Sequence, residues 1–556
     1  MLIITALALA SLAPAQVDAT AIAIAGQPAP GLPAVTHTTP ALIAVSPDGH
    51  VLLASTLANT TTTNDTAILT WRDGVTRLVA QENDPAPGVA GSVFDIFRVP
   101  RIDRTGRVAM TVRTRGASAN EVIYQELQPG TLSLIAALGQ RPPLFTTGSF
   151  NAIKQPWLTA DGALSFVGDV TSASPGSRTL FTYVNGTGRY YARQGDIANF
   201  IPGNPTFTFG NPTTEFIMAG ANEVGVFRTL ANGLCFIHGA PGQLQVLART
   251  GATPPGFSPP SSVSGLSDIT IGDDGTAAAT ITITNPTTSA LIAGRPGAIT
   301  LVAKPTDVVP NYTPGATFVS IPTPPIAGYP SSGLLVGPGG HLLFRANITD
   351  TAPVTARTAL MLRDPDGTMR PVAVTGRELG TTGITPTSIT PLNYHVNRRG
   401  DVLFVVGYAA NFAFVHWSRE RGHTIVYSSN QRISVDGSAP ESVTLTTFSL
   451  RSSLAEGAPL ILQSVFADDG TFAFTCRLAT GNAFAILSMR VPQPCDSIDF
   501  NNNQVFPEDQ DVIDFFNVLA GGDCPTCNDI DFNNNSVFPE DQDVIDFFTI
   551  LAGGTC

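Results

Sequence analysis

The sequence contains eight copies of a short turn that leads into an alternating strand, as in SPDGHVLLAS at Ser46 and TADGALSFVG at Thr159. The glycine of each turn tolerates a positive φ, so the chain can reverse tightly before the strand begins. Apolar and polar residues then alternate, which is typical of a half-buried strand. The copies begin at Ser46, Asp103, Thr159, Ala221, Gly272, Gly337, Asn397 and Ala467.

Two further strands follow each copy and complete a degenerate repeat. The second strand ends in a turn, as in AILTWRDG at Ala67, and the third has a Val-Ala-like core, as in LVAQEN at Leu78. The repeats recur roughly every 50–70 residues, a length that suits one four-stranded blade. We therefore expect a mainly β protein with a β-propeller of about eight blades over residues 16–491. Seven blades, a β-solenoid and two stacked sandwiches are the alternatives.

The first strand predicts how the ring closes. IAIAGQPAPG at Ile22 is of the third-strand type and precedes the first full copy, whereas the last copy has no such strand. The N-terminal strand can therefore complete the last blade. Closure would remove the open sheet edges that otherwise invite aggregation.

Composition excludes some classes of function. The chain has 43% hydrophobic and 13% charged residues, with 52 Gly and 44 Pro, which suits a turn-rich β protein. Its net charge of −13 argues against a nucleic-acid partner. The two lysines, Lys154 and Lys304, follow no glycine-rich loop, so the sequence has no phosphate-binding P-loop.

The N-terminus has the pattern of a secretory signal peptide. Residues 1–15, MLIITALALASLAPA, combine an apolar stretch with an A-x-A pattern. A buried first strand is the alternative. No stretch has the ~18 apolar residues of a membrane helix. We expect a secreted protein, extracellular or on the cell surface, in a compartment where cysteines can pair.

The repeats resemble a family of secreted bacterial proteins with tandem N-x-x-G-x-x-A-F motifs. The resemblance covers Ala19–Val491 and includes NRRGDVLF at Asn397 and ADDGTFAF at Ala467. Members of this family are found with various C-terminal anchoring modules, and the resemblance implies no activity.

The last part of the chain, residues 492–556, contains a duplication. Residues 495–524 and 527–556 align without a gap, and 24 of 30 paired positions are identical. Each copy has hard oxygen donors at positions 1, 3 and 5 of a loop, a carbonyl at position 7 and acidic residues on the helix that follows, a pattern that calcium prefers. The predicted ligands are Asp499, Asn501, Asn503, the Val505 carbonyl and Asp511, and in the second copy Asp531, Asn533, Asn535, the Val537 carbonyl and Asp543.

A short helix follows each loop. Pro507 suits its first position, Gly521 suits its C-cap, and Val512, Phe515, Phe516 and Leu519 form one apolar stripe. Position 12 of the loops is Gln510 or Gln542, so a neighbouring acid must close the site. We prefer Asp511 and Asp543 over Asp509 and Asp541. An Asn-rich turn that caps a helix without a metal is the alternative.

The duplicated half EF-hand resembles the dockerin modules of secreted bacterial proteins, in the variant with flanking cysteines and a terminal Gly-Cys. The resemblance covers Cys495–Cys556. It implies two Ca²⁺ sites and docking onto a cohesin-like or cell-envelope partner.

The tail cysteines allow three pairings. Repeat symmetry favours Cys495–Cys524 and Cys527–Cys556, each stapling one copy. The other two cysteines, Cys235 and Cys476, lie in separate blade strands and are predicted to be buried thiols.

No catalytic constellation is present in the sequence. It has no G-x-S-x-G or H-E-x-x-H motif, and the turn residues His50 and His341 are predicted to face solvent. The sequence therefore favours a non-enzymatic binding or surface-display protein, with a possible glycan ligand of the propeller. The alternative is a glycosidase or lyase that its tail recruits to a polysaccharide-degrading assembly. A structural envelope protein is a third class.

Overall fold

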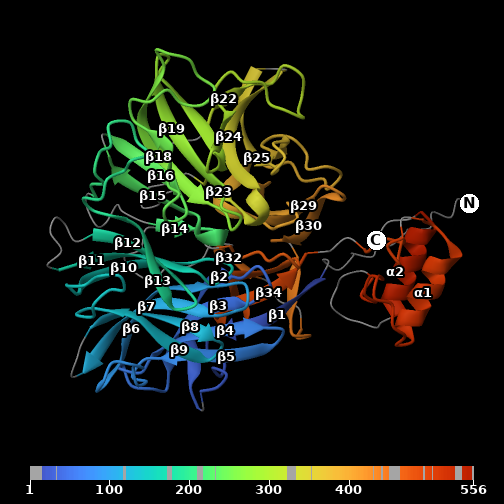
Figure 1. Cartoon of the computed structure of the whole chain (residues 1–556). Helices are drawn as coiled ribbons and strands as arrows, with labels where there is room; N and C mark the ends of the chain where they lie inside the picture. Colours follow the sequence, from blue (N-terminus) through green and yellow to red (C-terminus); the bar gives the residue numbers. More distant parts are fainter. Residues whose placement is uncertain are drawn as a thin grey trace, which may run out of the picture.

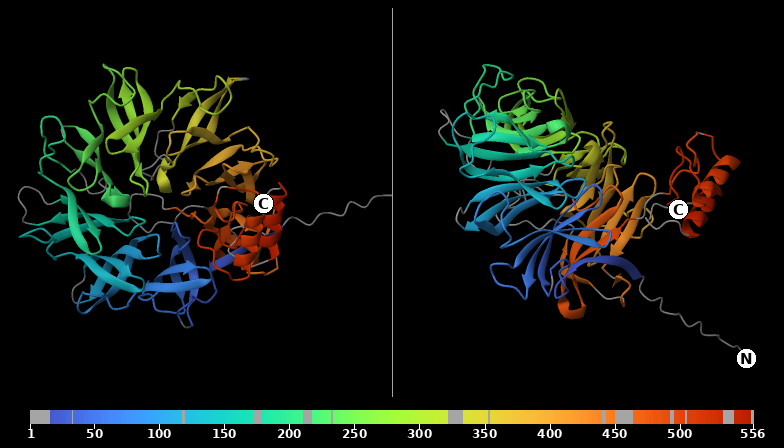
Figure 2. Two further views of the ribbon diagram at one scale, coloured as in Figure 1. Left: turned by 45° about the vertical axis from the view of Figure 1, so that its right-hand side comes forward. Right: turned by 60° about the horizontal axis from the view of Figure 1, so that its bottom comes forward.

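Eight β-sheets surround a central axis and form a β-propeller, so the predicted mainly β fold is confirmed (Figures 1 and 2). A pair of helices at the C-terminus stands outside the ring (Figure 1). The computed structural model describes residues 16–32, 34–116, 120–171, 178–209, 217–231, 233–321, 333–351, 354–429, 431–439, 443–449, 464–491, 495–503, 505–532 and 541–553.

The first four blades each have four antiparallel strands in chain order, with the first strand innermost. Blade 1 contains β2 (Thr36–Val45), β3 (Val51–Ala58), β4 (Thr66–Arg72) and β5 (Val75–Gln81). Blade 2 contains β6 (Ser92–Ile102), β7 (Val108–Gly116), β8 (Glu121–Gln128) and β9 (Thr131–Ala137). Blade 3 contains β10 (Phe150–Leu158), β11 (Leu164–Val170), β12 (Arg178–Val184) and β13 (Thr187–Arg193). Blade 4 contains β14 (Ile217–Ala219), β15 (Gly225–Leu230), β16 (Leu234–Gly239) and β17 (Gln245–Arg249).

The other four blades follow the same plan with two additions. Blade 5 contains β18 (Ser262–Ile271), β19 (Ala277–Thr284), β20 (Thr288–Arg295) and β21 (Ala298–Ala303). In blade 6, β22 (Phe318–Ser320) and β23 (Leu335–Val336) share the inner position beside β24 (Leu342–Thr351), β25 (Val354–Arg363) and β26 (Met369–Val374). Blade 7 contains β27 (Ser388–Val396), β28 (Val402–Tyr408), β29 (Asn411–Ser418) and β30 (Gly422–Ser428). Blade 8 contains β32 (Val443–Ser449), β33 (Thr471–Leu478), β34 (Phe484–Arg490), β1 (Gln16–Ile24) and β31 (Arg432–Val435).

The predicted glycine turns connect the first and second strands of the blades. The glycine has a positive φ in seven of them, at Gly49, Gly106, Gly162, Gly275, Gly340, Gly400 and Gly470. In blade 4 the prediction is wrong in detail, because Asn222 and Glu223 take the positive φ (55° and 57°) within the short 3₁₀ turn Ala221–Glu223. Asn often accepts this conformation, so the reversal does not need a glycine there.

The first residue of the turn has a role that the repeat alone did not reveal. The Oδ1 atom of Asn397 accepts the backbone N–H of Asp401 at 2.9 Å, and Ser46 Oγ accepts that of His50 at 3.0 Å. Asp103 and Thr159 make the same bond. In these four turns a short oxygen-bearing side chain therefore stabilises the reversal, which explains why Asn, Asp, Ser and Thr interchange there. The other four turns begin with Ala or Gly.

The N-terminal strand closes the ring, as predicted. β1 pairs antiparallel with β34 through Thr20–Ser488 and Ala21–Leu487. Its other edge pairs in parallel with β31, a contact that the sequence did not predict. The first half of the closing strand is therefore bonded to β31 and its second half to β34.

The hydrophobic core lies between neighbouring blades. Ile123 of blade 2 and Phe166 of blade 3, for example, belong to one buried cluster, and further clusters fill the interfaces around the ring. One cluster spans blades 7, 8 and 1 and contains Ile22, so the closing strand contributes to the core. No helix among the described residues is long and apolar enough to cross a membrane.

Candidate functional site

The C-terminal module, residues 495–556, consists of two copies that pack as one unit. Helix α1 (Asp509–Leu519) and helix α2 (Asp541–Leu551) meet through Phe515 and Phe547, whose rings stack with centroids 4.2 Å apart. The loops also exchange backbone bonds, because Asp496 N–H donates to the Phe532 carbonyl and Asn528 N–H to that of Phe500. Neither copy buries its own aromatic residues alone, and the two fold together.

The predicted ligands of the first loop lie along one tight turn. The N–H of Asn503 donates to Asp499 Oδ1 at 2.9 Å and to Asn501 Oδ1 at 3.1 Å. The N–H of Val505 donates to Asn503 Oδ1 at 2.7 Å. The three side-chain oxygens at positions 1, 3 and 5 therefore gather over the same stretch of backbone.

Asp511 connects this loop to the helix. Its side chain is fully buried, and its Oδ1 accepts the N–H of Phe500 at 2.9 Å. Its Oδ2 accepts the N–H of Glu508 in a capping box at the start of α1. Asp509, the other acid considered for the closing role, is exposed. The structure thus brings Asp511, and not Asp509, against the loop.

The second copy shows the same distribution of burial. Asp531 and Asp543 are buried, at 7% and 0% exposed, as their counterparts Asp499 and Asp511 are. Asn533, Asn535 and Val537 lie outside the described residues.

Charge in the chain is divided unevenly. Residues 495–556 contain 13 of the 43 Asp and Glu and none of the Lys, Arg or His, so this module carries the whole net charge of −13. Carboxylates and amide oxygens are hard donors, and the residues present suit a cation such as Ca²⁺. Within the described residues, no group of three or more His, Cys, Asp or Glu side chains is arranged to hold a metal. The predicted sites depend instead on Asn and carbonyl oxygens.

The symmetric disulfide pairing is wrong. Cys524 bonds to Cys527 across the seam between the copies, with Cα atoms 5.4 Å apart. Cys495 is also disulfide-bonded, and Cys556 lies outside the described residues. The two copies interlock and do not fold as separate stapled units, so repeat symmetry was a poor guide to pairing. The predicted buried thiols Cys235 and Cys476 are confirmed.

The predicted helix differs at its start and on its exposed face. Pro507 is predicted at the first helical position, but the helix begins at Asp509 with Glu508 as its N-cap. Ala520 is the C-cap, and Gly521, which follows it, has a positive φ (84°). Phe516 is not part of the buried stripe but is 42% exposed. It belongs to a module patch in which each copy exposes the same two positions. The module patch comprises Ile513, Phe516, Ile545 and Phe548.

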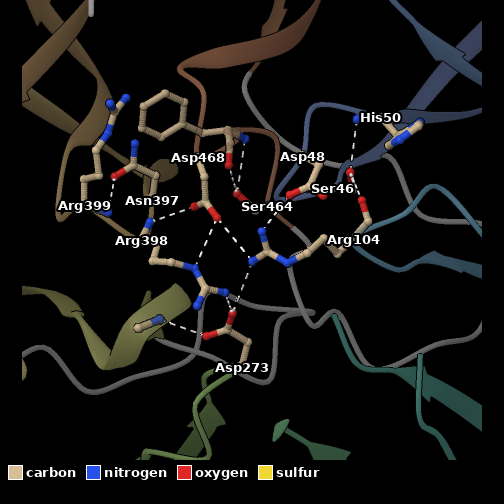
Figure 3. Close-up of polar contacts among 12 residues, drawn as sticks. Ser46, Asp48, His50, Arg104, Asp273, Asn397, Arg398, Arg399, Ser464 and Asp468 are labelled. Atoms are coloured by element: carbon tan, nitrogen blue, oxygen red, sulfur yellow. Dashed lines mark hydrogen bonds and ion pairs between the residues drawn. The ribbon is translucent and has the colours of Figure 1, made fainter. Parts of the chain in front are cut away.

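A second polar site lies on the propeller axis, where turns from five blades meet (Figure 3). Arg104 of blade 2 pairs with Asp48 of blade 1 at 2.6 Å and with Asp468 of blade 8 at 3.3 Å. Arg398 of blade 7 pairs with the same Asp468 at 3.3 Å and with Asp273 of blade 5 at 2.5 Å. These five residues form the axial cluster.

The axial cluster is built so that each carboxylate meets an arginine. Asp273 also accepts the N–H of Gly339 at 2.8 Å, and Asp468 accepts that of Arg398 at 2.8 Å. Burial raises the pKa of Asp273 above its ordinary value, although the Gly339 N–H and the Arg398 guanidinium oppose the shift. Such an arrangement connects blades by charge-assisted hydrogen bonds and occupies the carboxylates that an acid–base catalyst would need.

Two of the histidines depart from expectation. His341 is buried, because the neighbouring turn covers it. Its Nε2 lies 3.2 Å from the Arg398 carbonyl and its Nδ1 3.2 Å from Asp364 Oδ1. His50 is half-buried beside Arg72, and burial together with that guanidinium lowers its pKa.

Comparison with known proteins identifies the family. Residues 45–422 match a family of unknown function, DUF7453. The chain belongs to this family. The sequence has no significant match among curated proteins.

Several solved structures match parts of this chain at low identity. TolB from Acinetobacter baumannii matches at 12% identity with a TM-score of 0.26. The match covers 60% of this chain and 63% of TolB, so this chain spans less than two-thirds of the length of TolB. The β-propeller domain of the Trilobed protease from Pyrococcus furiosus matches at 11% identity and 0.32, over 70% of this chain and 98% of that domain. The Dos1 propeller matches at 9% identity and 0.34, over 82% and 94%.

Proposed function

We propose that this protein is a secreted, non-enzymatic binding or surface-display protein whose C-terminal module docks it onto a partner. The observation that carries the proposal is the module patch. Ile513 and Ile545 are 57% and 55% exposed, and Phe516 and Phe548 are 42% and 41% exposed, on helices whose other aromatic residues are buried. Large apolar side chains that gather on a small surface mark an interaction site.

Two Ca²⁺ ions would stabilise this module, in keeping with its resemblance to dockerin modules. Asp499, Asn501, Asn503 and the Val505 carbonyl would hold one ion with Asp511, and the equivalent residues of the second copy, which end in Asp543, would hold the other. The ions would offset the repulsion among 13 acidic side chains that have no basic neighbour in the module. They would also fix each loop to its helix and thereby hold the patch in shape.

The partner would be a cohesin-like domain or a component of the cell envelope. The test is biolayer interferometry of the full chain against purified cohesin domains and against washed envelope preparations, in Ca²⁺ and in EDTA. We expect the double variant Phe516→Asp/Phe548→Asp to bind at least tenfold more weakly, and EDTA to abolish binding. Leu144→Asp, which changes a 70% exposed apolar residue of the propeller, is the matched control and should bind normally. Wild-type affinity in the double variant would overturn the proposal.

A carbohydrate-active enzyme remains a second candidate because carboxylates converge on the axis. Burial raises the pKa of Asp273, which is the direction of shift that a general acid needs. Its pairing with Arg398 and the Gly339 N–H favours a structural role. A glycan array with the full chain, followed by product analysis on every bound polysaccharide, separates the two. Cleavage that Asp273→Asn abolishes would establish the enzyme, whereas binding without products supports the binding protein.

A further inference from the structure

One arginine near the axis is buried without an acidic partner. Arg101 on β6 is 4% exposed, and its Nε and Nη1 atoms have no hydrogen-bond partner. Its guanidinium carbon lies 4.9 Å from the centre of the Trp157 ring. No ion pair joins it to any carboxylate in the described parts of the chain. A cation in this position needs a counter-charge.

Other arginines of the same region show what the fold normally provides. Arg107 Nε lies 2.7 Å from Asp103 Oδ2, and Arg77 pairs with Glu126. Both of these acids have fully buried side chains. The fold therefore places a carboxylate beside each of these two arginines, whereas Arg101 has none among the described residues.

Irregular backbone directs Arg101 toward the axis. The pairing of β6 with β7 shifts register between Arg98 and Arg101, and Val99 in between has a φ of 48°. A positive φ is unfavourable for a β-branched residue, and such strain gathers at functional sites. A bulge re-aims the side chains that follow it. The Trp157 ring that Arg101 faces is itself fixed, because its Nε1 donates to the Ala219 carbonyl at 2.7 Å.

Arg101 lines a cavity of about 160 Å³ on the axis. The inner strands and turns of seven blades contribute to its wall, and the wall is mostly apolar side chain and backbone. The hydroxyl-bearing residues Ser46, Thr270 and Ser464 also line it, and two of them appear in Figure 3. Among the described residues of the wall, Arg101 is the one charged side chain. The volume holds a small molecule or ion but not a polymer.

The charge on Arg101 persists at neutral pH. Burial lowers the pKa of its guanidinium to about 10, which still leaves the group protonated. A buried charge without a partner destabilises the folded state, and a counter-ion that reaches it is bound more strongly than it would be in water.

We propose that this axial cavity binds a small oxyanion on the Arg101 guanidinium. A planar guanidinium recognises two oxygens of one group at once, so phosphate, sulfate and carboxylate share the required chemistry. The site is separate from the C-terminal module, and it stands or falls independently of the calcium proposal.

Isothermal titration calorimetry of the full chain at constant ionic strength tests this site. The titrants are inorganic phosphate, sulfate, acetate and glucuronate, so that the inorganic and carboxylate sources are compared directly. We expect one saturable site per chain, and the titrant with the highest affinity identifies the source. Arg101→Met should bind the anion at least tenfold more weakly than the wild type. The affinity of Arg101→Lys should lie between these two, because lysine keeps the positive charge but lacks the planar guanidinium that contacts two oxygens.

Arg113→Met is the matched control. Arg113 lies on β7 of the same blade, its side chain is 50% exposed, and it pairs with Asp95 at 2.6 Å, so its loss should leave anion affinity unchanged. A second readout is the melting temperature in anion-free buffer. There Arg101→Met should melt higher than the wild type, and added anion should stabilise only the wild type and Arg101→Lys.

Two results would overturn the proposal. One is the absence of saturable binding and of any thermal shift with all four anions in the wild type. The other is unchanged affinity in Arg101→Met or, if that variant does not fold, in Arg101→Lys.

Discussion

Arg104 and Asp468 lie 364 residues apart in the sequence, and their Nη2 and Oδ2 atoms are 3.3 Å apart on the propeller axis. Asp468 also accepts the backbone N–H and the Nε of Arg398. One carboxylate of the last blade therefore connects turns of blades 2 and 7. The contact with Arg104 depends on closure of the ring, because blades 8 and 2 are far apart in the sequence, whereas blades 7 and 8 are consecutive.

Asp468→Asn should destabilise the ring through this contact. The amide keeps an acceptor for the Arg398 N–H but removes the charge that two guanidiniums share, so we expect a loss of about 1–2 kcal/mol. Chemical denaturation of the full chain measures it. Asp73→Asn is the control, because Asp73 has a side chain 84% exposed and should change the free energy of unfolding little. Equal stability of wild type and Asp468→Asn would show that the axial cluster does not join the blades.

The closing strand predicts a larger effect. Ile22 on β1 is 6% exposed within the cluster that spans blades 7, 8 and 1. Ile22→Ala should cost about 2–4 kcal/mol, since it opens a cavity at the point where the ring closes. Ile96→Ala removes a 36% exposed side chain from β6 and serves as the comparison. If both variants unfold at the same denaturant concentration, closure by β1 does not control stability.

Acid should destabilise the propeller through two histidines. His238 and His416 are each 1% exposed, and burial lowers the pKa of both to about 4. The unfolded chain then binds more protons than the folded chain below the ordinary pKa of about 6.5, so the free energy of unfolding falls as pH drops. Each residue should account for a loss of about 2 kcal/mol between pH 7 and pH 5.

His238→Gln and His416→Gln measure these contributions. Denaturant unfolding at pH 7, 6 and 5 should show a shallower pH dependence in each variant than in the wild type. The prediction concerns this slope, so a change of stability at pH 7 does not affect it. Slopes identical to that of the wild type would contradict the account.

The fold was predictable because one glycine turn recurs in seven of the eight blades. The glycine positions and the strand alternation predicted the blades, and the missing last strand predicted the role of β1. The two short inner strands β22 and β23, which both pair with β24, were not predicted, because neither is long enough to show alternation. β31 was not predicted either, because it has only four residues and pairs in parallel, so no tight turn in the sequence marks it.

The axial residues could not have been identified from the sequence. Arg101 follows a bulge in β6 that no periodicity reveals, and its importance arises from the absence of an acid beside it. Asp273 and Asp468 directly follow Gly272 and Ala467, where two predicted turns begin, but their convergence depends on the curvature of the whole ring. In the module, spacing predicted that the side-chain oxygens of Asp499, Asn501 and Asn503 lie along one turn, whereas the disulfide pairing depended on how the copies interlock.

The most direct test is a titration of the full chain with Ca²⁺, measured by isothermal titration calorimetry in buffer freed of calcium with a chelating resin. The account predicts saturable binding of two Ca²⁺ ions per chain. It also predicts that Asp511→Asn and Asp543→Asn each lose one ion, while the exposed Asp509→Asn keeps both. Absence of saturable binding, or two ions still bound in Asp511→Asn/Asp543→Asn, would contradict it.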